Sequence, residues 1–203
     1  MSLITQNNAL EILQPHITKL CSILTGAWSD YLKYSPEQKI LHSPRTRANI
    51  IYDHAIDRAK TDLVDDESVR LVELPAGNKQ KLLLFRDALT VRPKMLDGKL
   101  MPKNHKSAQN SDLMGQRQLP GIPDICHLIA GYQLNGQETA VESLYLTCPN
   151  GKKNYWVFDI SNAIALPDTL SIPYAEDGYG SEFEQKKTEH EEKVVNYEGK
   201  AKS

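Results

Sequence analysis

Two patterns of hydrophobic spacing divide the chain. In the first third, apolar residues recur every three or four positions, which is the period of an amphipathic helix. One such stripe runs over residues 10–31 and is interrupted by Pro15, so we expect a kink there or a short first turn before the main helix. From Ser68 the period changes to two, with many β-branched and aromatic residues, which indicates strands.

The second predicted helix has clear start and stop signals. Ser43 is a favourable N-cap, and Pro44 is a favourable first helical residue. Apolar residues then line one face as far as Leu63. The aspartates around that position are unfavourable at a helix C-terminus, so we expect the helix to end near Leu63.

Five or six strands are expected in the middle of the chain. The segments with a strand pattern are residues 69–74, 81–85, 89–91, 127–134, 141–148 and 153–160. The third segment is expected to end before Pro93, which a central strand does not tolerate. The last two segments are joined by Asn150-Gly151, a strong hairpin signal.

Helices followed by strands predict an α+β domain over residues 1–174, with two N-terminal helices packed on a mostly antiparallel sheet of five or six strands. Residues 1–66 are its helical part and residues 67–165 its sheet. The sheet contains a basic irregular insert, 97–124, with little periodicity. Residues 175–203 are rich in Glu and Lys and form a charged tail. The length of 203 residues and a hydrophobic content of 40% suit one such domain.

Charge is unevenly distributed, although the net charge is only −2. Residues 79–117 carry nine lysines and arginines against three aspartates, and such a segment neutralises phosphates by releasing counterions. The alternative is a solvated loop, or one that docks on the acidic tail. The nine expected nucleic-acid-binding residues are Lys79, Lys81, Arg86, Arg92, Lys94, Lys99, Lys103, Lys106 and Arg117.

Arg47 and His54 lie on the second predicted helix with six residues between them. This spacing resembles the arginine–histidine motif of HEPN-type ribonucleases. The resemblance implies that Arg47 stabilises charge and that His54 acts on the ribose hydroxyl or the leaving group. The strand-rich remainder of the chain departs from that all-helical family. The alternative is a surface helix on which these side chains form local ion pairs.

A pair of carboxylates is expected across the last hairpin. If Asn150 and Gly151 form a two-residue turn, Glu142 stands opposite Asp159. Two opposed carboxylates repel each other, so one gains a raised pKa or the pair binds a cation. A divalent metal ion is the cofactor that this pairing implies, with general-acid catalysis as its other use. The alternative is a solvated, frayed end of the hairpin.

Three cysteines, Cys21, Cys126 and Cys148, are far apart and form no C-x-x-C motif. We expect three reduced and mostly buried thiols rather than a disulfide framework or a zinc site. No secretory signal is visible, and the apolar runs are too short to cross a bilayer, so we expect a cytoplasmic protein with no membrane partner. No glycine-rich phosphate loop or hydrolase motif is present, and no organic cofactor is indicated.

Four short segments carry a resemblance to a known family. They are Ser43-Pro-Arg-Thr-Arg-Ala, Gln118-Leu-Pro-Gly-Ile-Pro, Ala130-Gly-Tyr-Gln-Leu-Asn and Tyr145-Leu-Thr-Cys-Pro-Asn-Gly. Together they resemble a family of bacterial mobile-element proteins of similar length that are encoded beside helix-turn-helix regulators. The resemblance covers residues 40–160. It implies a role in phage defence, toxin–antitoxin function or control of the element, and it assigns no catalytic residue.

The sequence leaves two functions open. The first is a bacterial protein that acts on nucleic acid through residues 79–117, and the most specific version of this hypothesis is a toxin-like ribonuclease. The second is a non-catalytic interaction partner, antitoxin-like or an adaptor, whose charged tail folds on another protein. Converging polar groups in a concave site would favour the first function, and an exposed apolar patch would favour the second.

Overall fold

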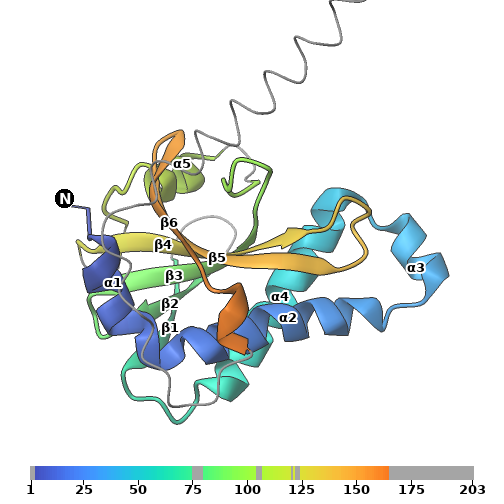
Figure 1. Cartoon of the computed structure of the whole chain (residues 1–203), viewed down its shortest axis with the longest axis horizontal. Helices are drawn as coiled ribbons and strands as arrows, with labels where there is room; N and C mark the ends of the chain where they lie inside the picture. The colour runs from blue at the N-terminus through green and yellow to red at the C-terminus, as the bar shows by residue number, and fades with distance from the viewer. Residues whose placement is uncertain (1–2, 75–79, 104–106, 120, 122–123, 165–203) are drawn as a thin grey trace, which may run out of the picture. The chain divides into compact units, whose positions relative to one another are not determined.

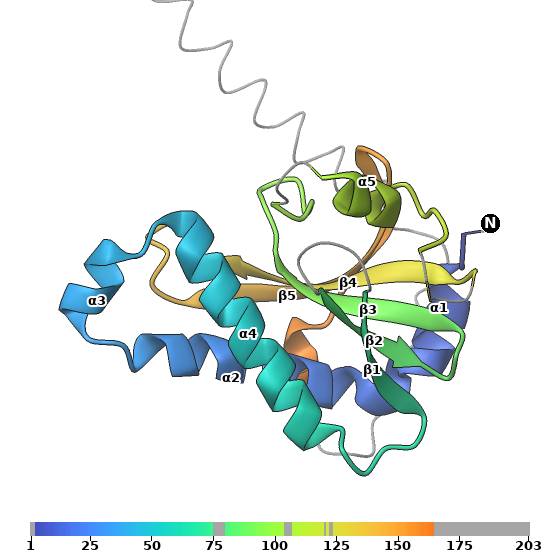
Figure 2. The same ribbon diagram turned by 180° about the vertical axis from the view of Figure 1, so that it is seen from behind.

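The computed structural model describes residues 3–74, 80–103, 107–119, 121 and 124–164. It has helices on both sides of a six-stranded sheet (Figure 1, Figure 2). N-terminal helices and a mostly antiparallel sheet confirm the predicted α+β class. The predicted tail, 175–203, lies outside the described residues. Within the described ranges, every helix is too short or too polar to cross a bilayer.

The N-terminal part folds into α1 (Gln6–Leu13), α2 (Ile17–Leu32), α3 (Pro36–Leu41) and α4 (Pro44–Asp62). Pro15 lies in a single 3₁₀ turn, η1 (Gln14–His16), which joins α1 to α2 at the predicted interruption. Helix α4 begins as predicted, because the Ser43 Oγ accepts the Thr46 N–H at 3.1 Å, and it ends at Asp62, with Leu63 as its C-cap. The short helix α3 was not predicted.

The sheet follows the order of the chain from β1 to β6. Its strands are β1 (Val69–Glu73), β2 (Lys81–Phe85), β3 (Leu89–Met95), β4 (Cys126–Leu134), β5 (Val141–Asn150) and β6 (Lys153–Asp159), followed by the 3₁₀ turn η2 (Ser161–Ile164). All neighbours are antiparallel except β3 and β4. A parallel pair needs a crossover, and the predicted irregular insert supplies it with the helix α5 (Ala108–Met114).

Helices cover both faces of the sheet. On one face α2 packs against β4 and β5, α4 packs against β3, and the centroids of the His16 and Phe85 rings are 5.1 Å apart. On the other face α5 contributes Leu113 to a buried cluster that includes Leu82 of β2. Leu82 and Phe85 pack on opposite faces of the sheet, because successive strand residues alternate between the faces and these two are three positions apart. Figure 2 shows α5 across the sheet from α2 and α4.

The β5–β6 hairpin departs from the predicted register. Its two-residue loop is Gly151-Lys152 rather than Asn150-Gly151, and Gly151 has the positive φ, 66°, that such a turn requires. A β-bulge at Tyr155 then shifts the register once more. Beyond the bulge, each residue of β5 faces a residue of β6 three positions later than predicted.

Candidate anion-binding site

Strand β3 places two cationic side chains on one face of the sheet. Arg92 and Lys94 flank Pro93, and alternation along a strand directs both toward the face that α5 covers. The Arg92 Nη1 donates a hydrogen bond to Oδ1 of Asn110 in α5 at 2.8 Å. The crossover therefore packs over Arg92 instead of leaving it in solvent.

Arg92 is buried, and Lys94 is half-buried. Arg92 is only 4% exposed, and its buried Nε has no hydrogen-bond partner within the described residues. Burial lowers the pKa of Arg92 to about 10. Burial also lowers the pKa of Lys94 to about 7, and the neighbouring charge of Arg92 adds to this effect. Each group is thus held where its charged form is unfavourable.

The described part of the chain provides no ion-pair partner for Arg92 or Lys94. The centroid of the Tyr52 ring lies 6.0 Å from Cζ of Arg92 and 5.7 Å from Nζ of Lys94. An aromatic face attracts a cation more weakly than a buried carboxylate does. Buried charges in proteins normally have a partner of opposite charge, so we expect an anion to bind beside Arg92 and Lys94.

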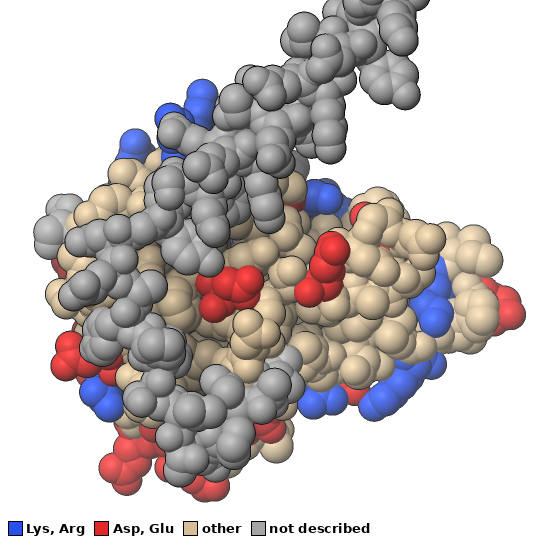
Figure 3. Space-filling view, in the orientation of Figure 1, with Lys and Arg blue, Asp and Glu red and all other residues tan. Residues whose placement is uncertain are grey.

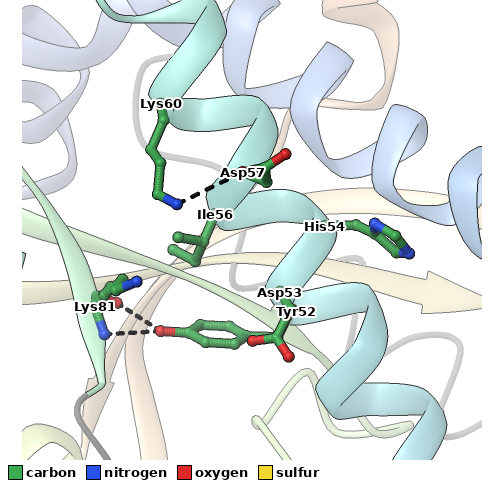
Figure 4. A pocket seen from close by; sticks show the side chains of 7 residues that line it. All are labelled: Tyr52, Asp53, His54, Ile56, Asp57, Lys60 and Lys81. Atoms are coloured by element: carbon green, nitrogen blue, oxygen red, sulfur yellow. Dashed lines mark hydrogen bonds and ion pairs between the residues drawn. The ribbon is translucent and has the colours of Figure 1, made fainter.

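The backbone of β2 holds Tyr52 in place (Figure 4). Its hydroxyl donates to the Lys81 carbonyl at 2.8 Å and accepts the Lys81 N–H at 2.9 Å. The pairing of β2 with β3 stops at Leu83, which faces Val91. If the same register continued, Lys81 would face Pro93, which has no N–H to donate. The Tyr52 hydroxyl takes the place of the missing ladder bonds, which fixes its ring beside the two cations.

A groove of about 420 Å³ adjoins Tyr52 along α4 (Figure 4). Its lining consists of Tyr52, Asp53, His54, Ile56, Asp57, Lys60 and Lys81. This lining contains two aspartates and two lysines, so its formal charges cancel. Nζ of Lys60 lies 3.5 Å from Oδ1 of Asp57. In Figure 4 the His54 ring points to the opposite side of α4 from Tyr52. We therefore place the candidate site at the unneutralised pair on β3 rather than in this groove.

Three other predicted nucleic-acid-binding residues share the C-terminal end of β3 with this pair. The antiparallel neighbour β2 begins with Lys81 at that end, and Lys99 and Lys103 lie in the segment that follows Met95, the last residue of β3. The Lys103 N–H donates to the Met95 carbonyl at 3.2 Å, which ties this segment to the end of the strand. The C-terminal end of β3 is thus shared by Lys81, Arg92, Lys94, Lys99 and Lys103, but Lys81, opposite Pro93 in the register, directs its side chain to the face that α4 covers.

Two other predicted cations, Arg86 and Arg117, lie away from this region. Arg86 lies in the turn at the N-terminal end of β3, and Arg117, which pairs with Asp112 at 3.3 Å, lies beside the start of β4 at the same end. Lys79 and Lys106 lie outside the described residues. On the face seen in Figure 3, basic and acidic side chains form separate small groups rather than one continuous basic surface.

Arg47 and His54 occupy one side of α4, two turns apart, but contact different partners. Arg47 forms an ion pair with Glu138 from the β4–β5 loop. The centroid of the His54 ring is 6.1 Å from that of Tyr34. Nε of Arg47 and Nε2 of His54 are buried without a hydrogen-bond partner in the described ranges. No contact of the described residues joins the two side chains, so their joint catalytic role stays a prediction.

The predicted opposition of Glu142 and Asp159 is wrong. Asp159 faces Tyr145 on β5, and its Oδ1 accepts the Ser161 N–H at 2.8 Å. The shifted loop and the β-bulge move every position of β6, and neither has a signal in the hairpin sequence. Among the described residues no group of three or more His, Cys, Asp or Glu side chains is placed to hold a metal ion. The metal site thus loses the pairing from which it was inferred.

Sequence reasoning missed two parts of this site, Tyr52 and Asn110. Tyr52 lies in the predicted helix that begins after Ser43 and was given no role in a site, and Asn110 falls in the insert for which no element was predicted. Pro93 was the available signal. A proline inside a strand leaves backbone groups of the neighbouring strand without partners, so a polar side chain must approach them. The sequence does not show which side chain does so.

Comparisons of the chain with protein-family models, with curated proteins and with solved structures find no match.

Proposed function

We propose that this protein binds the phosphate groups of a nucleic acid at the C-terminal end of β3, with Arg92 and Lys94 as the central cations. The supporting observation is their burial side by side without a carboxylate partner among the described residues. Removing a cation from water without a counter-charge is unfavourable. An anionic ligand supplies the counter-charge, and the free energy that it recovers contributes to binding.

Phosphate suits these two side chains. A guanidinium donates parallel hydrogen bonds to two phosphate oxygens, and an ammonium adds a compact charge. Arg92 has one nitrogen bound to Asn110 and still has Nε without a partner in the described part of the chain. Lys94 is less deeply buried than Arg92, so it makes the first contact with a ligand that approaches from solvent.

The surrounding lysines indicate a chain of phosphates rather than one small anion. Lys81, Lys99 and Lys103 share this end of the sheet with the central pair. Successive phosphates along a nucleic acid strand match cations spread over several side chains. Tyr52 is the ring beside the pair, and its hydroxyl is held by Lys81. The contact is therefore expected to be mainly with the backbone, with little base preference.

Fluorescence anisotropy tests this proposal with labelled single-stranded RNA, single-stranded DNA and duplex DNA, at salt concentrations between about 50 and 200 mM. Lys94→Gln is expected to weaken binding to every probe and to reduce the slope of log K against log salt by about 1. The matched control is Arg86→Gln, which removes an exposed cation from the opposite end of β3 and is expected to have a smaller effect.

The absence of binding at low salt would overturn the proposal. Equal losses of probe affinity in Lys94→Gln and Arg86→Gln would show that the nucleic acid does not bind at Arg92 and Lys94. Free phosphate, added at constant ionic strength, separates a site for one anion from a site for a polymer. Electrophoresis of the same samples reports whether the probes are cut, and cleavage that His54→Ala abolishes would support the catalytic role predicted for His54.

A protein-interaction function is the second candidate, and α3 supports it. Ile40 and Leu41 are 83% and 82% exposed, Leu32 before them is 44% exposed, and α3 contains no buried residue. Adjacent exposed apolar side chains are typical of protein contact sites. Light scattering of the wild type and of an Ile40→Ser/Leu41→Ser variant tests whether the patch mediates self-association. A monomer at every concentration would exclude that use.

A further inference from the structure

Two buried thiols lie beside each other on neighbouring strands. The Sγ atoms of Cys126 on β4 and Cys148 on β5 are 3.7 Å apart, and the residues are 4% and 0% exposed. The antiparallel register of β4 and β5 explains the contact, because it places both side chains on the face shared by Ala130 and Leu146. All three cysteines are free, as predicted, but this pair was not recognisable from their spacing.

Gln116 fixes the strands at this point, where the β4–β5 ladder has ended. Its Nε2 donates to the carbonyls of His127 and Pro149 at 2.7 and 2.8 Å. Its Oε1 accepts the His127 N–H at 2.8 Å and the Cys126 thiol at 3.3 Å. One buried amide thus bridges both strands next to the two sulfur atoms. The short distance between the thiols is therefore part of a hydrogen-bonded core rather than of a loop.

The segment before α1 covers the pair. Trp156 of β6 stands opposite Cys148, and its indole N–H donates to the Ile4 carbonyl at 2.9 Å. Hydrogen bonds from Cys148 and from the Ile4 backbone lower the pKa of Cys126, whereas the same contact and burial raise the pKa of Cys148. Cys126 is thus the better nucleophile of the two. Local opening of the residues just before α1 would give a small oxidant access to it.

We propose that Cys126 and Cys148 are a site of oxidative modification and form a disulfide when the protein meets a hydroperoxide. The thiolate of Cys126 attacks one oxygen of hydrogen peroxide, the O–O bond breaks, and the departing hydroxide takes up a proton to give water. The sulfur of Cys148 then attacks the sulfenic acid on Cys126, the S–O bond breaks, and a second water leaves. Two thiols lose two protons and two electrons, and the peroxide is reduced to two waters.

The geometry requires only a local change. A disulfide bond is about 2.05 Å long, so each sulfur moves by less than about 1 Å from its present position. Rotation of the Cys126 thiol away from Gln116 breaks one hydrogen bond of that amide and leaves its contacts with the two strands in place. The bond closes a loop between residues 22 positions apart in the chain.

The test is peroxide treatment of the full folded chain, followed by thiol counting and mass spectrometry under non-reducing conditions. The expected result is a monomer that has lost two of its three thiols and the mass of two hydrogen atoms, with the two peptides that contain Cys126 and Cys148 joined. Dithiothreitol is expected to reverse the change. The oxidised form is expected to melt about 5–10 °C higher, because the cross-link restricts the unfolded chain.

Matched variants decide between this pair and the third thiol. Cys21 is buried on α2, its thiol donates to the Ile160 carbonyl at 3.3 Å, and burial raises its pKa to about 12, so Cys21→Ser should oxidise like the wild type. Cys148→Ala, with folding verified by circular dichroism, should form no intramolecular disulfide. Trp156→Phe removes the bond to Ile4 and should oxidise several times faster. Three intact thiols in the treated native protein, or cross-links that involve Cys21, would overturn the proposal.

Discussion

The hydroxyl of Tyr52 forms two hydrogen bonds with the backbone of Lys81, accepting from its N–H at 2.9 Å and donating to its carbonyl at 2.8 Å. One side chain of α4 thereby completes the sheet at the position where Pro93 leaves it incomplete. The same contact sets the distance between α4 and β2. It also fixes the aromatic ring beside the cations of β3, so the candidate site and the docking of this helix depend on one phenol oxygen.

Tyr52→Phe should destabilise the protein by about 1–3 kcal/mol, because it leaves both backbone groups of Lys81 without this partner. Urea denaturation measures the loss, and hydrogen exchange should show faster exchange of the Lys81 amide. Tyr155→Phe is the matched control, since Tyr155 is 51% exposed. Equal stability of Tyr52→Phe and wild type would show that water replaces the hydroxyl at no cost.

Replacing Lys94 by methionine should stabilise the folded protein by about 1–3 kcal/mol at pH 7, because a buried cation without a counter-charge is removed. The folded-state pKa of Lys94, about 7, lies below the ordinary value of 10.5. The unfolded chain therefore binds more protons between these two values, and wild-type stability should rise with pH through that window. The advantage of Lys94→Met should be largest at and below pH 7 and should shrink toward pH 10.5.

The stability of Lys94→Met also separates a functional lysine from a structural one. If Lys94 stabilises the fold, replacing it should lower the free energy of unfolding. If Lys94 serves binding, replacing it should raise the free energy of unfolding and weaken binding of the nucleic acid probes. Thermal unfolding from pH 6 to pH 10 gives the first quantity and anisotropy gives the second. Lys99→Met, an exposed neighbour, should leave stability within about 0.5 kcal/mol of wild type.

Gln116→Leu should lower the free energy of unfolding by about 3 kcal/mol or more. Gln116 is 6% exposed, and its amide forms hydrogen bonds with backbone groups of both β4 and β5. Hydrogen exchange should localise the damage at the His127 amide. Gln118→Leu changes an exposed glutamine two residues away and should be nearly neutral. A loss below about 1 kcal/mol in Gln116→Leu would mean that the strands close the gap by themselves.

Local signals in the sequence predicted the elements whose ends are set by short-range chemistry. Ser43 and Pro44 define the start of α4 because a cap and a first-turn proline act within one helical turn. The predicted strand segments lie within a few residues of the observed ones for the same reason, since alternation is local. Strand β3 was expected to end before Pro93, but it continues to Met95 because it pairs with β4 through Lys94 and Met95.

Features that depend on distant parts of the chain were not predictable in the same way. The shifted hairpin loop and the bulge at Tyr155 together removed the expected pairing of Glu142 with Asp159. Arg92 and Lys94 alternate with apolar residues and therefore look like a solvated strand face. Arg92 is covered by the α5 crossover and both side chains lie beside Tyr52 of α4, and no local pattern specifies the position of either helix over the sheet.

Asp30 and Arg58 connect α2 to α4 and should account for part of the sensitivity of the fold to acid. The Arg58 Nε donates to Asp30 at 2.6 Å, and the Lys33 ammonium contacts the same carboxylate at 2.7 Å. Hydrogen bonds from Arg58 and then Lys33 hold the pKa of Asp30 well below its ordinary value of 3.8. Because the folded-state pKa is lowered, this stabilisation is complete above pH 3.8 and is lost as the pH falls toward the folded-state pKa.

Asp30→Asn should therefore destabilise the protein by about 1–2 kcal/mol at pH 7, and its difference from wild type should shrink below about pH 4. Asp57→Asn is the matched control on α4, because the Asp57 side chain is 78% exposed and its removal should cost less than about 0.5 kcal/mol. Gly26→Ala provides an independent test, since a Cβ at Gly26 would stand 2.4 Å from Nη1 of Arg58 and displace the guanidinium. If Asp30→Asn in the Gly26→Ala background still costs as much as in wild type, the pair with Arg58 is not the source of the stabilisation.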